Sequence, residues 1–72
     1  MKQMDKAIKA GRLAISAEQI GSELECEQAA RTCGRLAACA GVSLDALFVQ
    51  LAPSALAWNS MVDGWYAESE AN

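Results

Sequence analysis

The side chains that could act as nucleophiles or metal ligands are those of Cys26, Cys33 and Cys39. Cys26 and Cys33 are seven residues apart. On a helix this places them roughly 10 Å apart along the axis, too far for a disulfide between them. Zinc sites use closely spaced cysteines or histidine partners, and the chain has neither a CxxC sequence nor a histidine. We interpret the cysteines as reduced thiols that act as small buried hydrophobic side chains, and we expect no metal and no cofactor.

The remaining group with acid–base potential comprises Glu23, Glu25 and Glu27. A general base near neutral pH is most often histidine, and a nucleophilic cysteine or serine needs such a base beside it. The glutamates occupy the first turns of an expected helix, where negative charge interacts favourably with the helix dipole. The sequence also lacks a glycine loop that would bind phosphate. We therefore expect a protein that is not an enzyme.

Four segments must position these side chains, and each has hydrophobic residues at helical spacing. They cover about residues 3–15, 23–40, 43–51 and 54–68, and no segment alternates with the period of a strand. The sequence thus predicts an all-α fold, a small bundle of three to four helices in one domain over residues 1–72. The acidic tail, residues 67–72, is expected to fray.

Helix ends are indicated by capping residues. Ser16 with Gln19, and Ser22 with Glu25, match the capping-box pattern, and Ser22 is the expected start of the second helix. Gly41 is expected to end that helix, Ser43 to cap the third, and Pro53 to precede the fourth.

Each expected helix has one face that periodicity assigns to the core. On the second helix this face consists mostly of small side chains, which would let another helix approach closely. The predicted buried residues are Met4, Ile8, Gly11 and Ile15, then Cys26, Ala29, Ala30, Cys33, Leu36, Ala37 and Ala40, then Leu44, Leu47, Phe48 and Leu51, and finally Trp58, Val62 and Trp65, on the side of the fourth helix that also carries Ala55 and Met61.

Residues 36–51, LAACAGVSLDALFVQL, form two helical runs joined by a Gly-Val-Ser turn. This segment resembles the repressor/Cro-type helix-turn-helix family, in which the second helix enters the major groove of DNA. The resemblance implies a transcription regulator as an alternative function. The corresponding positions here hold Leu44, Asp45 and Phe48, which cannot pair with base acceptors or phosphates. We therefore do not expect this helix to read DNA.

Charge also argues against a nucleic acid partner. The formal net charge is −3 and the calculated pI about 4.6, whereas DNA-binding domains are usually basic. Residues 1–12 carry a net charge of +3, and the remainder of the chain carries −6. No segment resembles a signal peptide or reaches the roughly 18 apolar residues that span a bilayer. We expect a soluble, cytoplasmic protein with no membrane partner.

Hydrophobic residues make up 53% of a chain of only 72 residues, which is more apolar side chain than such a small bundle can hide. We therefore expect a homodimer. Short, acidic chains without catalytic residues are similar in kind to virus- or mobile-element-encoded inhibitors of host machinery, including anti-CRISPR proteins. The sequence thus favours a module that binds another protein. The candidate partner-binding residues on the fourth helix are Trp58, Met61, Trp65 and Tyr66. Of these, Trp58 and Trp65 are expected to point inward, and Met61 and Tyr66 to lie at the rim. A second candidate site is the outer face of the second helix, with Arg31 and Arg35.

Overall fold

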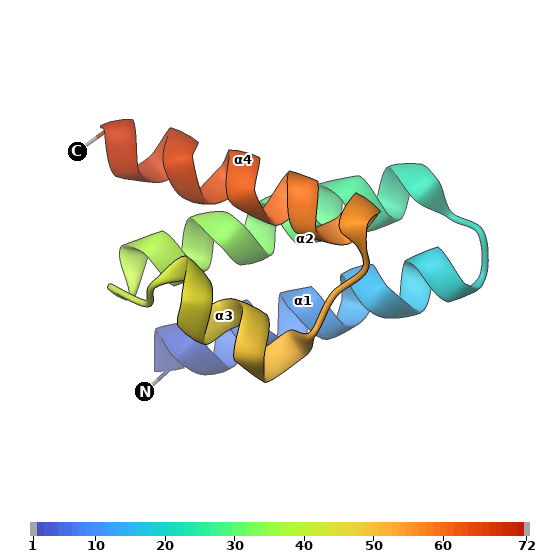
Figure 1. The fold of residues 1–72 in the computed structure, drawn as a ribbon, viewed down its shortest axis with the longest axis horizontal. Coiled ribbons are helices and arrows are strands. Elements are labelled where there is room, and N and C mark those ends of the chain that lie inside the picture. The colour runs from blue at the N-terminus through green and yellow to red at the C-terminus, as the bar shows by residue number, and fades with distance from the viewer. Residues whose placement is uncertain (1, 72) are drawn as a thin grey trace.

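The computed structural model describes the backbone of residues 2–71 and the side chains of residues 4–71. Over that range the chain has four α-helices and no strand, which confirms the predicted all-α bundle. The helices are α1 (Lys2–Gln19), α2 (Glu23–Cys39), α3 (Leu44–Leu51) and α4 (Ala55–Ala71) (Figure 1). None of the described helices is both long enough and apolar enough to cross a membrane.

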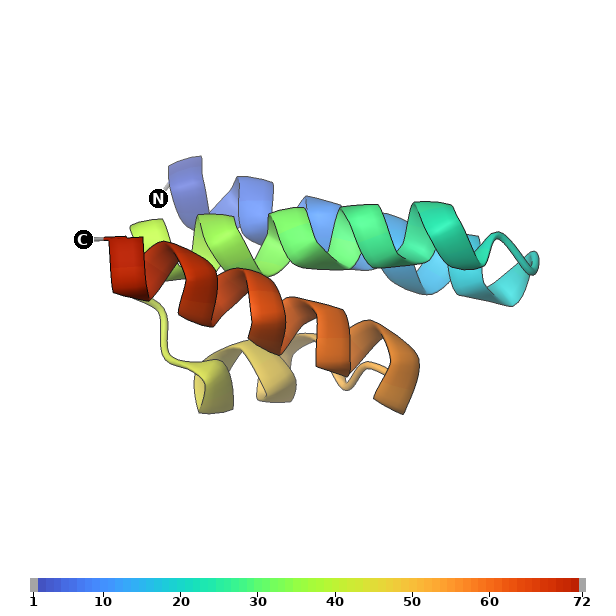
Figure 2. The ribbon, with the colours of Figure 1, turned by 90° about the horizontal axis from the view of Figure 1, so that it is seen from above.

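The central helix of the bundle is α2, which packs against both α1 and α4. α1 and α2 form an antiparallel hairpin, whereas α4 runs in the same direction as α2 (Figures 1 and 2). The short α3 connects the end of α2 to the start of α4 at the other end of the molecule. It contacts both α1 and α4. The start of α1 and the end of α4 therefore lie at the same end of the molecule.

Two glycine turns end α1 and α2 in the same way. Gly21 has a φ of 82°, and the Ser22 amide donates a hydrogen bond of 2.8 Å to the carbonyl five residues before it. Gly41 has a φ of 75°, and the Val42 amide donates the equivalent bond at 2.9 Å. Both turns are Schellman motifs, which satisfy the last carbonyls of a helix and favour glycine because of the positive φ. The predicted end of the second helix at Gly41 is confirmed.

Serine side chains cap the two helices that follow. Ser43 Oγ accepts a hydrogen bond of 3.2 Å from the Ala46 amide, which confirms the predicted cap of α3. Ser54 Oγ accepts from the Ala57 amide at 3.3 Å and donates to the Glu18 carboxylate. The Ser54 side chain therefore both caps α4 and ties its start to the end of α1.

Three expectations about helix ends are wrong. Ser16 lies inside α1, which continues to Gln19 because no glycine or proline stands between Ser16 and Gly21. Ser22 does precede α2, but its side chain makes no capping hydrogen bond, so neither capping box forms. The fourth helix, expected to end at about residue 68, continues to Ala71, and Asn72 lies outside the described residues.

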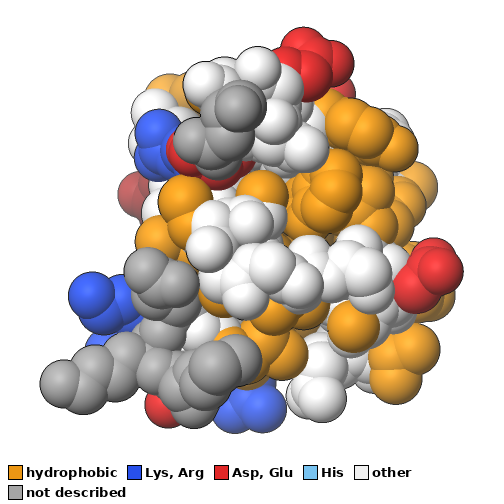
Figure 3. Space-filling view, turned by 90° about the vertical axis from the view of Figure 1, so that its left-hand side faces the viewer, with side chains coloured by type: hydrophobic (Ala, Val, Ile, Leu, Met, Phe, Trp, Pro, Cys, Tyr) orange, Lys and Arg blue, Asp and Glu red, His pale blue; other side chains and the backbone are white. Residues whose placement is uncertain are grey.

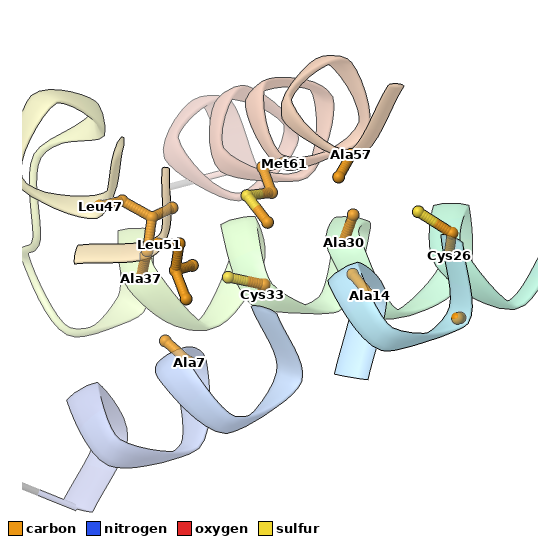
Figure 4. Close-up of a cluster of buried hydrophobic side chains, with 11 residues drawn as sticks. Ala7, Ala14, Cys26, Ala30, Cys33, Ala37, Leu47, Leu51, Ala57 and Met61 are labelled. Carbon is orange, nitrogen blue, oxygen red and sulfur yellow. The ribbon is translucent and has the colours of Figure 1, made fainter. Parts of the chain in front are cut away.

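The core is built mainly from small side chains, which lets the helix backbones approach closely (Figure 4). The predicted small face of α2 is confirmed, since four of its residues are fully buried. The buried hydrophobic residues are Ala7, Ala14, Ala17, Cys26, Ala30, Cys33, Ala37, Leu47, Leu51, Ala57 and Met61. Leu47 and Met61 are the largest fully buried side chains, so the core holds few large groups.

The closest contact between α2 and α4 is made by two glycines. A Cβ added to Gly34 would overlap the carbonyl oxygen of Met61 and would lie 2.8 Å from the Trp65 amide nitrogen. A Cβ added to Gly64 would overlap the carbonyl oxygen of Arg31 in the same way. α2 and α4 therefore touch backbone to backbone, with no room for a methyl group at either glycine.

This close packing changes which helix faces are buried. On α1 the fully buried alanines are Ala7 and Ala14, whereas Met4, Ile8 and Ile15, predicted as the core face, are only partly buried. On α3 the prediction is correct for Leu47 and Leu51 but wrong for Phe48, which is 45% exposed. Because small residues bring the helices together, the larger side chains are displaced to the edges of the contacts.

Candidate interaction surface

The large side chains of α4 lie beside its contact with α2 rather than within it. The residues that α4 buries are Ala57, Ser60, Met61 and Gly64. Met61, expected at the rim as a partner-binding residue, is fully buried, so that expectation is wrong. Trp58, Val62 and Trp65 follow one another at i, i+4 and i+7 along the flank of α4 that faces α3, and all three are half-buried.

Aromatic side chains of α3 and α4 meet on this flank. The rings of Phe48 and Trp58 are 5.1 Å apart between centroids, with an interplanar angle of 78°. The rings of Trp65 and Tyr66 are 5.2 Å apart at 80°, and the Tyr66 side chain is 51% exposed. We name the group Phe48, Trp58, Val62, Trp65 and Tyr66 the aromatic surface. Figure 3 shows hydrophobic side chains gathered where α4 and α3 lie together.

Two contacts fix the orientation of the indole rings. Trp65 Nε1 donates a hydrogen bond of 2.8 Å to the Val42 carbonyl, which ties α4 to the turn between α2 and α3. The edge-to-face contact with Phe48 holds the Trp58 ring against α3. Contacts within the chain therefore hold both indole rings in place.

The charged groups near the aromatic surface are acidic. From residue 36 to the end of the chain there are four acidic residues, Asp45, Asp63, Glu68 and Glu70, and no lysine or arginine. Arg31 and Arg35, the other predicted partner-binding residues, are exposed on α2. The Arg31 backbone lies against Gly64 of α4, so these arginines border α4, but the ring contacts of the aromatic surface include neither of them.

A second surface feature is an open groove of about 620 Å³ along α1. Its lining combines apolar side chains with the cations of Lys9 and Arg12, and Gln50 of α3 closes one side. The lining residues are Met4, Asp5, Ile8, Lys9, Arg12, Leu13, Ser16 and Gln50. Sequence reasoning did not find this groove, because it depends on where α3 crosses α1.

The thiols do not form a reactive site. Cys26 and Cys33 are buried as expected, whereas Cys39 is exposed, so its assignment to the core is wrong. Burial raises the pKa of Cys33 to about 11, against the opposing effect of a hydrogen bond with the backbone of Gly11. Burial, followed by nearby carboxylates, raises the pKa of Cys26, and desolvation followed by Glu68 raises that of Cys39. All three therefore remain protonated thiols at neutral pH, and a protonated thiol is a poor nucleophile.

The carboxylates do not cluster either. Glu23 and Glu25 are exposed at the start of α2. Among the described residues no three Cys, Asp or Glu side chains lie close enough together to hold a metal ion.

Comparison of the chain with models of protein families, with curated proteins and with solved structures finds no match.

Proposed function

We propose that the protein is a non-enzymatic interaction module that binds another protein through the aromatic surface. The observation that carries this proposal is the set of aromatic rings shared by α3 and α4, in which half-buried tryptophans hold the exposed rings of Phe48 and Tyr66. Tyrosine, tryptophan and phenylalanine are enriched at the centres of protein interfaces, where they bury a large area at a small entropic cost.

The partner that fits this surface has an apolar pocket bordered by lysine or arginine. Asp45, Asp63 and Glu70 are exposed acidic residues of α3 and α4, so a basic rim would be complementary and an acidic one repelled. We further propose that the protein acts by occupying its partner's surface, as an inhibitor or regulator, in the manner of virus- or mobile-element-encoded inhibitors. The three free cysteines suit a reducing compartment such as the cytoplasm.

An affinity pull-down from the lysate of the source cells, with matched alanine variants, tests the proposal. Phe48→Ala and Tyr66→Ala remove exposed rings from the aromatic surface, and each should weaken capture of the partner by about tenfold or more. Leu24→Ala is the control, because Leu24 is a 67% exposed hydrophobic residue of α2 that takes no part in the ring contacts of the aromatic surface. Capture that is equal for all three variants would contradict the proposal.

The same pull-down can test the other candidate site, Arg31 and Arg35 on α2. If the partner were acidic and bound to α2, Arg31→Glu would abolish capture and Phe48→Ala would not. We expect the opposite result, because the exposed aromatic rings lie on α3 and α4.

The alternative function, DNA binding by the segment that resembles a helix-turn-helix, requires α3 to present hydrogen-bond donors. The exposed side chains of α3 are those of Asp45, Ala46, Phe48, Val49 and Gln50, so α3 offers DNA a negative charge, three apolar groups and the amide of Gln50 as its one exposed side-chain donor. A mobility-shift titration with duplex DNA across a salt series separates the two functions. Binding to phosphates would weaken steeply as salt rises, whereas we expect no shift at any salt concentration.

A further inference from the structure

The groove along α1 and the exposed side of α4 are complementary in charge and in apolar character. The groove holds the cations of Lys9 and Arg12 beside the apolar side chains of Met4 and Ile8, with Asp5 as its one acidic group. It is therefore a basic, amphipathic depression in a chain whose net charge is negative.

The matching feature is a row of three exposed residues on α4. Asp63, Tyr66 and Glu70 are spaced i, i+3 and i+7, so they lie on one face of the helix. All three are exposed, and in sequence position Tyr66 lies between the two acidic residues, while its ring packs edge-to-face against Trp65. We name these residues the α4 row. The Tyr66 ring is complementary to the apolar side chains in the groove. The two carboxylates of the α4 row are complementary to the two cations of the groove.

We propose that a second copy of this chain occupies the groove, with Tyr66 of one copy seated against Met4 and Ile8 of the next and the carboxylates of the α4 row paired with Lys9 and Arg12. The contact shares Tyr66 with the aromatic surface, and so it rests in part on the proposed function. Self-association and partner binding then compete for Tyr66. The partner is bound by a copy whose Tyr66 is free, either in the dissociated chain or at one end of an assembly.

The groove and the α4 row are different patches of the same molecule, so this contact is heterologous. Two copies joined by it leave one groove and one α4 row free. Self-association should therefore start with a dimer and continue as the concentration rises, and it should weaken with salt because the charges are at the surface.

Charge reversal on each side, followed by mixing, tests the contact. The first variant carries Lys9→Glu with Arg12→Glu, and the second carries Asp63→Lys with Glu70→Lys. Each variant alone places like charges on both sides of the contact, and its self-association should be weaker than that of the wild type by about tenfold or more. An equimolar mixture should associate again, because each groove then meets an α4 row of opposite charge.

The matched control is Arg31→Glu with Arg35→Glu, which changes the net charge of the chain as much as the first variant does but on α2. Sedimentation velocity at tens of micromolar, with circular dichroism to verify folding, reports the result. We expect the wild type and this control to sediment above the 7.6 kDa of one chain. The proposal is overturned if the wild type is monomeric, if the control loses association as much as the first variant does, or if the mixed variants stay apart.

The partner pull-down separates this contact from the proposed function. The variant with Lys9→Glu and Arg12→Glu should still capture the partner, whereas Phe48→Ala should lose the partner and keep self-association. If the first of these variants loses the partner and still self-associates, the groove binds the partner and the proposed contact is wrong.

Discussion

The backbone contact between α2 and α4 makes a strong prediction about one methyl group. Gly34→Ala adds a Cβ that would overlap the Met61 carbonyl oxygen and lie 2.8 Å from the carbonyl carbon of Met61 and from the amide nitrogen of Trp65. Both neighbours are backbone atoms within a helix, so neither can rotate away. The two helices must separate instead.

The size of the effect follows from how far they must move. Ordinary van der Waals contact for a Cβ begins at 3.4 Å, so the two contacts at 2.8 Å alone require 0.6 Å of separation, and the closer overlap with the Met61 carbonyl oxygen requires more. A gap of about 0.5–1 Å already forfeits a quarter to a half of the dispersion attraction between the atoms it separates. Because α4 packs mainly on α2, this loss extends over the largest helix contact in the molecule.

Overpacking of this kind costs about 1–3 kcal/mol, and rigid backbone neighbours place Gly34 at the upper end of that range. Alanine has the better helix propensity, which returns about 1 kcal/mol. We therefore expect a net loss of about 2 kcal/mol, a large share of the about 4–11 kcal/mol typical for a domain of this size. The melting temperature should fall by about 8–16 °C.

Gly11→Ala is the internal control. A Cβ at Gly11 would meet the end of the Leu51 side chain, which can rotate, and the sulfur of Cys33 at 3.1 Å. The gain in helix propensity should then offset most of the crowding, to leave stability within about 1 kcal/mol of the wild type.

Thermal and urea unfolding followed by circular dichroism measure both variants. The double variant with Gly34→Ala and Gly64→Ala should lose less than the sum of the single losses, because one separation of the helices relieves both overlaps. A melting temperature for Gly34→Ala equal to or above that of Gly11→Ala would refute the backbone contact.

Two further predictions concern the core and its titration. Leu47→Ala should lower the free energy of unfolding by about 2–5 kcal/mol because Leu47 is fully buried. Phe48→Ala should lower it by about 1 kcal/mol, mainly through loss of the ring contact with Trp58. Equal losses for the two variants in urea unfolding would place Phe48 in the core. Folding raises the pKa of Cys33 from 9.0 to about 11, so the folded chain holds this proton more tightly than the unfolded chain does. The free energy of unfolding should therefore fall as pH rises from 9 towards 11, and Cys33→Ala should show a shallower fall over that range; parallel curves for both proteins would contradict the shift.

Local rules predicted the helices and some of their ends. Gly41 and Ser43 act through their own backbone and side-chain hydrogen bonds, so their positions could be read from the sequence. Ser16 and Ser22 match the same pattern without forming its hydrogen bonds, since the pattern alone does not show whether the helix continues through it.

The choice of buried face could not be read in the same way. Periodicity favours the largest hydrophobic residues, and on α1 and α4 it selected Ile8 and Trp58 over Ala7 and Ala57. The distance between helices decides this choice, and it is a property of the pair rather than of either segment. One signal was present: Gly34 lies in the middle of its helix, where glycine costs about 1 kcal/mol relative to alanine and thus indicates a close approach.

The aromatic surface follows from the same glycines. When α2 and α4 touch at Gly34 and Gly64, no space remains between them for an indole ring, and Trp58 and Trp65 must lie along the flank. There α3 and the Val42 carbonyl hold them in place. A wider bundle would bury these rings and expose less apolar area. Gly34 and Gly64 set the distance between α2 and α4, and this distance determines where the tryptophan rings of the aromatic surface lie. Separation of the helices by Gly34→Ala should therefore shift the tryptophan fluorescence as well as lower stability.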